Sequence, residues 1–287
     1  MPELPEVETI ARELREGSGR RGPTVVGQTI TAVTLRWPRH LADGGPRAFR
    51  RRIVGQSIRG VGRRGKYIVF DLSRDTLLIH LRMSGELRVA SATEPRSPHD
   101  HTCFCLGNGS EMRFNDTRKF GRVHLVADPE EVTGPLGPEP LAPDFTARKL
   151  GRMLAARKRA LKPLLLDQTF LAGLGNIYTD EALHRARLHP LRRSDSLTPA
   201  EVSRLYRGIR AAFRRGIQLN GASLDWVYQG GGMQNEFRVY GREKKPCPRC
   251  RTLIQKITLG QRSTHFCPQC QSADSSHQSA APLAREW

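Results

Sequence analysis

Apolar residues recur every three or four positions near the start of the chain. Val7, Ile10, Ala11 and Leu14 would share one face of a helix, so the pattern predicts an amphipathic helix here. Short runs rich in β-branched residues follow, most of them separated by Gly, Asn, Asp or Pro: TITAV, YIVFDL, LLIHLRM, HTCFCL, EMRFN and RVHLVA. Runs of this kind predict an antiparallel sandwich or barrel.

Proline and glycine gather in GPLGPEPLAPD, so residues 134–145 are expected to form a linker. Beyond it, residues 146–161, 176–187 and 198–215 carry apolar side chains at helical periods. Thr198 and Glu201 form the capping-box pair of a helix start, with a proline between them. Residues 272–287 have the composition of a disordered tail.

The charge is strongly unbalanced. Lys and Arg number 47 against 28 Asp and Glu, a formal net charge of +19. Residues 146–166 contain seven basic side chains and no acidic one, and a second basic set recurs at helical spacing: Arg204, Arg207, Arg210, Arg214 and Arg215. We expect both sets to face the phosphates of a nucleic acid. No apolar run reaches the length of a membrane span, and MPELPEVETI lacks the features of a secretory signal.

Four cysteines stand in two Cys-x-x-Cys pairs near the end of the chain. Cys247 and Cys250 are followed, after sixteen residues, by Cys267 and Cys270. This spacing is typical of a tetrahedral zinc site. Because four thiolates leave no position for water, we expect one structural Zn²⁺ that holds a hairpin containing TLIQKITL. Cys103 and Cys105 are expected to pack inside a strand instead.

The chain begins Met1-Pro2-Glu3, and methionine before proline is normally removed. An α-amino group has a pKa of about 8, so part of it is uncharged at neutral pH. Such an amine can attack a sugar's anomeric carbon, with Glu3 placed to transfer a proton. The same residues are equally ordinary as the start of a helix, so the chemistry alone leaves both interpretations open.

Taken in order, several segments resemble the bacterial formamidopyrimidine-DNA glycosylase family, and the resemblance extends from Met1 to about Gln271. They are MPELPEVET, GKY, HLRMSG, NDTRKFG, LGPEPL, KPLLLDQ, GLGNIY and the cysteine hairpin. The resemblance implies an α+β multidomain fold: an antiparallel β-sandwich with a flanking helix (residues 1–133), the linker (134–145), a helix–two-turns–helix domain (146–240) and a zinc hairpin (241–271).

The family's activity would make this chain a bifunctional enzyme that removes oxidised purines from DNA and then cleaves the strand by β,δ-elimination. By resemblance, Pro2 is the Schiff-base nucleophile and Glu3 the proton donor that helps open the sugar. Lys66 would serve β-elimination and Arg262 δ-elimination. The implied partner is damaged duplex DNA, bound by a monomer in the bacterial cytoplasm at the nucleoid, without a nucleotide cofactor or a membrane.

A base inside a duplex must leave the stack before its sugar can react. In the family, wedge side chains support the distorted DNA, and they match Met83, Arg118 and Phe120 here. By residue type alone, Met83 and Phe120 would be interpreted as core. Further matched DNA contacts are His99, Arg157 and Asn176, and Glu6 is expected to line the lesion pocket.

Two alternatives remain at this point. The sister endonuclease VIII type removes oxidised pyrimidines, but it usually has glycine where this chain has Leu4, and it lacks the wedge triplet. A non-catalytic zinc protein that binds nucleic acid would be expected to have lost Pro2, Glu3, Lys66 or Arg262.

Overall fold

The computed structural model describes residues 1–18, 20–223 and 228–273. The chain divides into two compact units. The first contains residues 1–139, 171–173 and 213–236, and the second contains residues 140–170 and 174–212 together with the segment from Phe237 onward. The predicted tail lies outside the described residues from position 274 onward.

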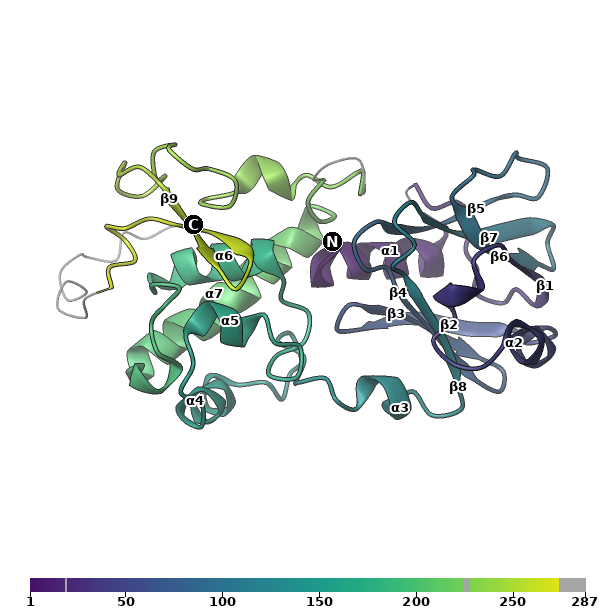
Figure 1. Ribbon diagram of the computed structural model, residues 1–287, viewed down its shortest axis with the longest axis horizontal. Helices are drawn as coiled ribbons and strands as arrows, with labels where there is room; N and C mark the ends of the chain where they lie inside the picture. The colour runs from purple at the N-terminus through teal and green to yellow at the C-terminus, as the bar shows by residue number, and fades with distance from the viewer. Residues whose placement is uncertain (19, 224–227, 274–287) are drawn as a thin grey trace. The chain divides into compact units, whose positions relative to one another are not determined.

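The first unit begins with helix α1 (Leu4–Glu16), which extends the predicted helix at both ends. Two four-stranded antiparallel sheets follow, in the orders β1-β6-β7-β5 and β2-β3-β4-β8 (Figure 1). Their strands are β1 (Ile30–Leu35), β2 (Ile58–Arg64), β3 (Tyr67–Leu72), β4 (Thr76–His80), β5 (Gly85–Ser91), β6 (Asp100–Leu106), β7 (Ser110–Asp116) and β8 (Arg122–Val126). The unit also contains helix α2 (Pro46–Ile53), the single turn α3 (Glu130–Thr133), the 3-10 helices η1 (Pro38–His40) and η3 (Met233–Glu236), and the end of α7 (Pro199–Gln218).

One hydrophobic core joins α1 to both sheets. Ile10 and Leu14 of α1 pack in the same cluster as Phe70 of β3 and Phe104 of β6, and all four are buried. Burial of this apolar surface is the main stabilising contribution to the unit. Because α1 is fixed by this core, the segment before it is held in a defined place, and that segment contains the predicted nucleophile.

The second unit is helical and ends in a hairpin. It contains α4 (Ala147–Ala155), α5 (Leu161–Leu165), α6 (Asn176–Ala186), most of α7 (Pro199–Gln218), β9 (Gln255–Leu259) and β10 (Arg262–Phe266). The helix predicted over residues 146–161 is wrong in extent, because α4 ends at Ala155 and α5 is a separate helix. The capping box of α7 is confirmed: Glu201 N donates to Thr198 Oγ1 and Thr198 N donates to the Glu201 carboxylate.

Within the described residues, no helix combines the length and the apolar character needed to cross a lipid bilayer.

Candidate functional site

The start of the chain is fixed by backbone hydrogen bonds. Glu3 is the N-cap of α1, and its N–H donates to Glu6 Oε2 at 2.9 Å. The other oxygen of Glu6 accepts from Ala222 N at 2.7 Å. Leu4 N donates to the Gly173 carbonyl at 3.1 Å. Pro2 and Glu3 are buried, so the predicted nucleophile and proton donor lie in a defined, largely enclosed place.

Gly173 has a specific reason to be glycine. Its φ is +92°, and a Cβ at this position would lie 2.6 Å from Leu4 Cδ1. A side chain would therefore push on the residue next to Glu3. The sequence identified the GLGNIY segment, which contains this glycine, only as a motif; the close approach could not be predicted from it.

Lys66 lies in the turn between β2 and β3 and is buried. The preceding residue, Gly65, donates its N–H to Glu139 Oε1 at 2.5 Å. Arg63 forms a bidentate pair with the same carboxylate, at 2.8 and 3.0 Å. Burial would raise the pKa of Glu139, but the hydrogen bonds and charge of Arg63 outweigh burial and lower it. A charged carboxylate thus fixes the turn that positions Lys66.

Met83, Arg118 and Phe120, the three predicted wedge residues, come from two loops of the first unit. Met83 and Phe120 are 37% and 48% exposed, although their residue types are typical of a core. The Arg118 guanidinium lies over the Phe120 ring, 5.0 Å from its centroid. The Arg118 N–H donates to Ser84 Oγ at 3.1 Å, which links the loop of Arg118 and Phe120 to that of Met83.

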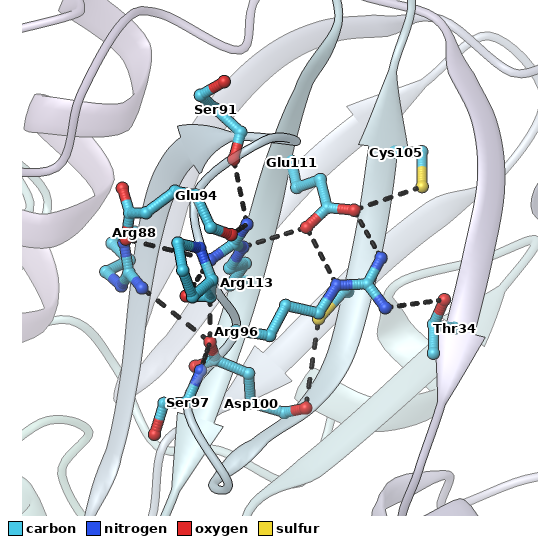
Figure 2. Close-up of polar contacts among 12 residues, drawn as sticks. Thr34, Arg88, Ser91, Glu94, Arg96, Ser97, Asp100, Cys105, Glu111 and Arg113 are labelled. Carbon is cyan, nitrogen blue, oxygen red and sulfur yellow. Dashed lines mark hydrogen bonds and ion pairs between the residues drawn. The ribbon is translucent and has the colours of Figure 1, made fainter.

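His99 is exposed on the loop between β5 and β6, and a buried arginine anchors this loop (Figure 2). Arg113 of β7 donates to the carbonyls of Ser91 and Glu94, at 2.9 and 2.7 Å, and to Glu111. The Glu111 carboxylate also pairs with Arg96 of the loop. The hydrogen bonds from Arg96 and Arg113 lower the pKa of Glu111, although burial would raise it.

The four predicted zinc ligands gather in the second unit. Their sulfur atoms lie within 4.8 Å of one another, and the Cys250–Cys267, Cys250–Cys270 and Cys247–Cys270 separations are 3.4, 3.4 and 3.9 Å. Thiolates about 2.3 Å from a central zinc would lie about 3.8 Å apart, so the donor set fits one tetrahedral Zn²⁺. His184 Nε2 lies 3.4 Å from Cys247 Sγ, as a supporting contact behind the ligands.

The hairpin presents Arg262 beside a tight turn. Gly260 and Gln261 both have positive φ, 52° and 61°, as a two-residue hairpin turn requires. Arg262 follows them as the first residue of β10 and is exposed. Asn176, at the start of α6, donates to Ser263 Oγ at 3.3 Å. The structure therefore brings two predicted site residues, Asn176 and Arg262, into one neighbourhood of this unit.

A buried ion pair, which the sequence did not reveal, attaches this hairpin to the helices. Lys162 Nζ donates to Asp180 Oδ1 at 2.7 Å and to the Ser263 carbonyl at 2.8 Å. Both charged side chains are at most 1% exposed. The other oxygen of Asp180 accepts the His265 N–H at 2.9 Å. Lys162 was expected among the phosphate-facing residues, and that expectation is wrong.

The second basic set also needs correction. Arg204 donates to the Ala186 carbonyl, Arg210 to the Pro140 carbonyl, and Arg215 pairs with Glu236. Three of the five arginines thus bind oxygen atoms of their own chain, while Arg207 and Arg214 are exposed. Arg157 is exposed just beyond α4 and contacts none of the other predicted site residues through a described hydrogen bond.

Three family models match the chain in order. The formamidopyrimidine-DNA glycosylase N-terminal domain matches residues 1–123, the formamidopyrimidine-DNA glycosylase H2TH domain residues 136–227, and the zinc finger found in FPG and IleRS residues 244–273.

Curated relatives and solved structures agree with these matches. The formamidopyrimidine-DNA glycosylases of Geobacillus kaustophilus and Protochlamydia amoebophila are 45% and 44% identical, each over 94% of this chain and 100% and 99% of the relative. A wild-type Lactococcus lactis Fpg (MutM) bound to N7-benzyl-Fapy-dG DNA superposes with a TM-score of 0.87 at 37% identity, covering 94% of this chain and all of that one. MutM bound to carbocyclic 8-oxo-G DNA gives 0.86 at the same identity and coverage. The sandwich that fixes the chain start, the helical unit and its four-cysteine hairpin are thus those of the formamidopyrimidine-DNA glycosylase family, to which this chain belongs.

Proposed function

We propose that this protein removes oxidised purines from duplex DNA and then cleaves the strand at the resulting abasic site. The observation that carries the proposal is the chain start: Pro2 and Glu3 are both buried, and the backbone at Glu3 and Leu4 is held by hydrogen bonds to Glu6 and Gly173. Holding a nucleophile and a proton donor in one geometry removes much of the entropic barrier to their joint action.

In the first step, the uncharged Pro2 nitrogen donates its electron pair to C1′ of the deoxyribose, and the damaged base leaves with the electrons of the glycosidic bond. The nitrogen then loses the proton it carried, and the departing base takes up a proton, so that neither keeps the charge of this step. Glu3 gives a proton to the ring oxygen, the C1′–O4′ bond breaks, and an iminium forms. Because proline is a secondary amine, this iminium cannot lose an N–H proton and stays cationic. The positive charge acidifies C2′ and so prepares elimination.

Two eliminations follow. Loss of a C2′ proton expels the phosphate on the 3′ side, and a second elimination expels the phosphate on the 5′ side. We assign Lys66 to proton transfer in the first elimination and Arg262 to the second. Zinc, when bound by Cys247, Cys250, Cys267 and Cys270, supplies no reactive position, and its contribution is to keep the hairpin rigid.

DNA is bound through His99, Arg118, Arg157 and Asn176, with Met83 and Phe120 filling the space left by the extruded nucleotide, and Glu6 lies at the lesion pocket. We further propose that the protein acts as a monomer at the nucleoid, in the cytoplasm. We also propose that residues 1–133, 146–240 and 241–271 act as the sandwich, DNA-binding and zinc-hairpin domains, with residues 213–236 of the second packing in the first compact unit. Purine lesions are favoured because solved relatives hold Fapy-dG and carbocyclic 8-oxo-G DNA. One Lactococcus lactis structure holds an oxidised pyrimidine, so that class is the second candidate substrate.

Borohydride trapping tests the proposal. The processed protein is mixed with a duplex carrying 8-oxoguanine opposite cytosine, and hydride reduces the iminium to a stable amine. Mass mapping of the trapped complex should place the DNA on Pro2 and not on Lys66. A matched duplex with an oxidised pyrimidine compares the two substrate classes. Absence of a covalent complex with either duplex, in protein verified to start at Pro2, would contradict the proposal.

A further inference from the structure

Two exposed loops of the first unit share one buried carboxylate. Among the large apolar side chains of the described residues, few are exposed, and Met83 and Phe120 are two of them. Met83 lies between β4 and β5, and Phe120 between β7 and β8. Both side chains stand on short connections between strands, so their positions depend on how the backbone of these connections is held.

Asp116, the last residue of β7, provides that support. Its side chain is completely buried. Oδ1 accepts from Ser84 Oγ at 2.5 Å, and Oδ2 accepts from Gly121 N at 2.7 Å. Ser84 directly follows Met83, and Gly121 directly follows Phe120. The two oxygens of one carboxylate therefore hold the residues that adjoin two exposed apolar side chains on different loops.

Ser84 and the backbone of Asp116 extend the connection. Ser84 Oγ, while donating to Asp116, accepts from Arg118 N at 3.1 Å. The N–H of Asp116 donates to the His99 carbonyl at 3.0 Å. The neighbouring Asn115 donates to Asp100 at 2.8 Å, which joins this group to the anchored loop of Figure 2. Asp116 is therefore connected, directly or through Ser84, to the backbone segments that carry Met83, Arg118, Phe120 and His99.

Both side-chain oxygens of Asp116 must act as hydrogen-bond acceptors for these contacts to form. Ser84 and Gly121 are donors to separate oxygens, and His40 Nε2 approaches Oδ2 at 3.4 Å. Burial alone would raise the pKa of Asp116, but these contacts lower it to about 2, so the carboxylate is charged at neutral pH. Asparagine has the same shape but would turn an NH₂ group toward one of the donors.

The loops are also conformationally restricted. Arg82 and Lys119, each beside a wedge residue, have φ of 54° and 60°, a region that disfavours side chains other than glycine. A Cβ on Gly121 would lie 2.3 Å from the Phe114 ring. Such backbone states persist where surrounding bonds determine them. Arg82 N donates to His80 Nδ1 and Lys119 N donates to the Asp116 carbonyl, while the Asp116 carboxylate holds Ser84 and Gly121, which follow the two wedge residues.

We propose that Asp116, acting through Ser84 and Gly121, is the positioning residue that sets the Met83–Arg118–Phe120 wedge in the conformation needed to support an extruded nucleotide. This inference rests on the proposed function. Asp116 does not touch the reacting atoms, so its contribution should appear in reactions that require extrusion from a duplex and should be absent where no duplex must be opened.

The test compares two substrates in single-turnover reactions. One is a duplex with 8-oxoguanine opposite cytosine and a 2-aminopurine beside the lesion, and the other is a single strand with one abasic site. For D116N, loss of a charge-assisted hydrogen bond should slow excision by at least about tenfold. The rise in 2-aminopurine fluorescence, which reports extrusion of the neighbouring lesion, should slow by the same factor. Cleavage of the single strand should stay within about twofold of the unaltered protein, because the Pro2 chemistry is intact.

Further variants serve as controls for D116N. D75N changes another buried, ion-paired aspartate of the same unit, which pairs with Arg52 and lies in neither loop, and it should leave both reactions unchanged. S84A removes only the hydroxyl that links Asp116 to Arg118 and should slow excision in the same direction, so it decides the matter if D116N does not fold. In a protein with Met83 and Phe120 replaced by alanine, D116N should add little further slowing.

The inference is overturned if D116N and S84A leave excision unchanged, if D75N slows it equally, or if the single-strand reaction falls in parallel. Failure of the proposed function has a different signature, since the unaltered protein would then not be trapped by borohydride at all.

Discussion

The buried Lys162–Asp180 pair is expected to determine whether the zinc hairpin stays attached to its unit. Lys162→Met removes the cation but leaves the Asp180 carboxylate in a place where both side chains are at most 1% exposed. Breaking such a pair typically costs 3–5 kcal/mol, because the remaining charge is uncompensated. His265 still donates its N–H to Asp180, so we expect the low end, about 3 kcal/mol.

Zinc release into a chromogenic chelator during urea titration measures this cost, because all four cysteines belong to the second unit. With a urea dependence of about 2 kcal/mol per molar, the midpoint should fall by roughly 1.5 M. The matched control is the double variant K162M/D180L, which replaces the pair by apolar side chains and should recover most of the loss. An unchanged midpoint in K162M, or a double variant no better than the single one, would refute the reasoning.

Three further expectations concern the metal, acid stability and DNA binding. Cys250→Ser should lose zinc by native mass spectrometry and weaken DNA binding by anisotropy while the first unit melts as before; unchanged affinity would argue against the hairpin's assignment. Burial lowers the pKa of His80 to about 3, and its Nδ1 accepts from Arg82 N. The stabilising contribution of neutral His80 is therefore complete above pH 6.5 and is lost as the pH falls from 6.5 toward 3, which amounts to about 2 kcal/mol between pH 7 and 5. The difference between the urea midpoints at pH 7 and pH 5 should be smaller in His80→Gln than in the unaltered protein, and an equal difference in the two proteins would contradict this. If four cations of the protein each neutralise a phosphate, affinity should fall about 150-fold between 50 and 200 mM salt, and a flat response would contradict the proposed contacts to the DNA backbone.

The elements with a clear repeat could be predicted from the sequence. A local sequence pattern was sufficient to predict α1 from its helical period, β3 and β6 from their β-branched runs, and the zinc site from its paired cysteines. Strands β2 and β5 and helix α2 were not found. Glycines at 60 and 62 interrupt the apolar alternation of β2, β5 contains only one β-branched residue, and α2 is rich in arginine. Their formation depends on pairing and packing with distant segments, which no local pattern records.

The candidate site divides in the same way. The chemical types of Pro2, Glu3 and the cysteines suggested their chemistry before any coordinates. Lys162 and Asp116 did not, because a lysine in a basic stretch and an aspartate after a strand are both usually exposed. Only the distant Ser263 carbonyl and Ser84 hydroxyl reveal that these two charges are buried and bonded.

The most direct test of the account is to block the amine of Pro2 and leave everything else intact. The same chain is prepared in two forms, one processed to a free Pro2 and one retaining Met1, each verified by mass. Both are assayed on a duplex carrying 8-oxoguanine and on a pre-formed abasic site. The account predicts that only the processed form cuts either substrate and is trapped by borohydride, while both forms bind the DNA. Full-speed cleavage by the form that keeps Met1 would contradict it.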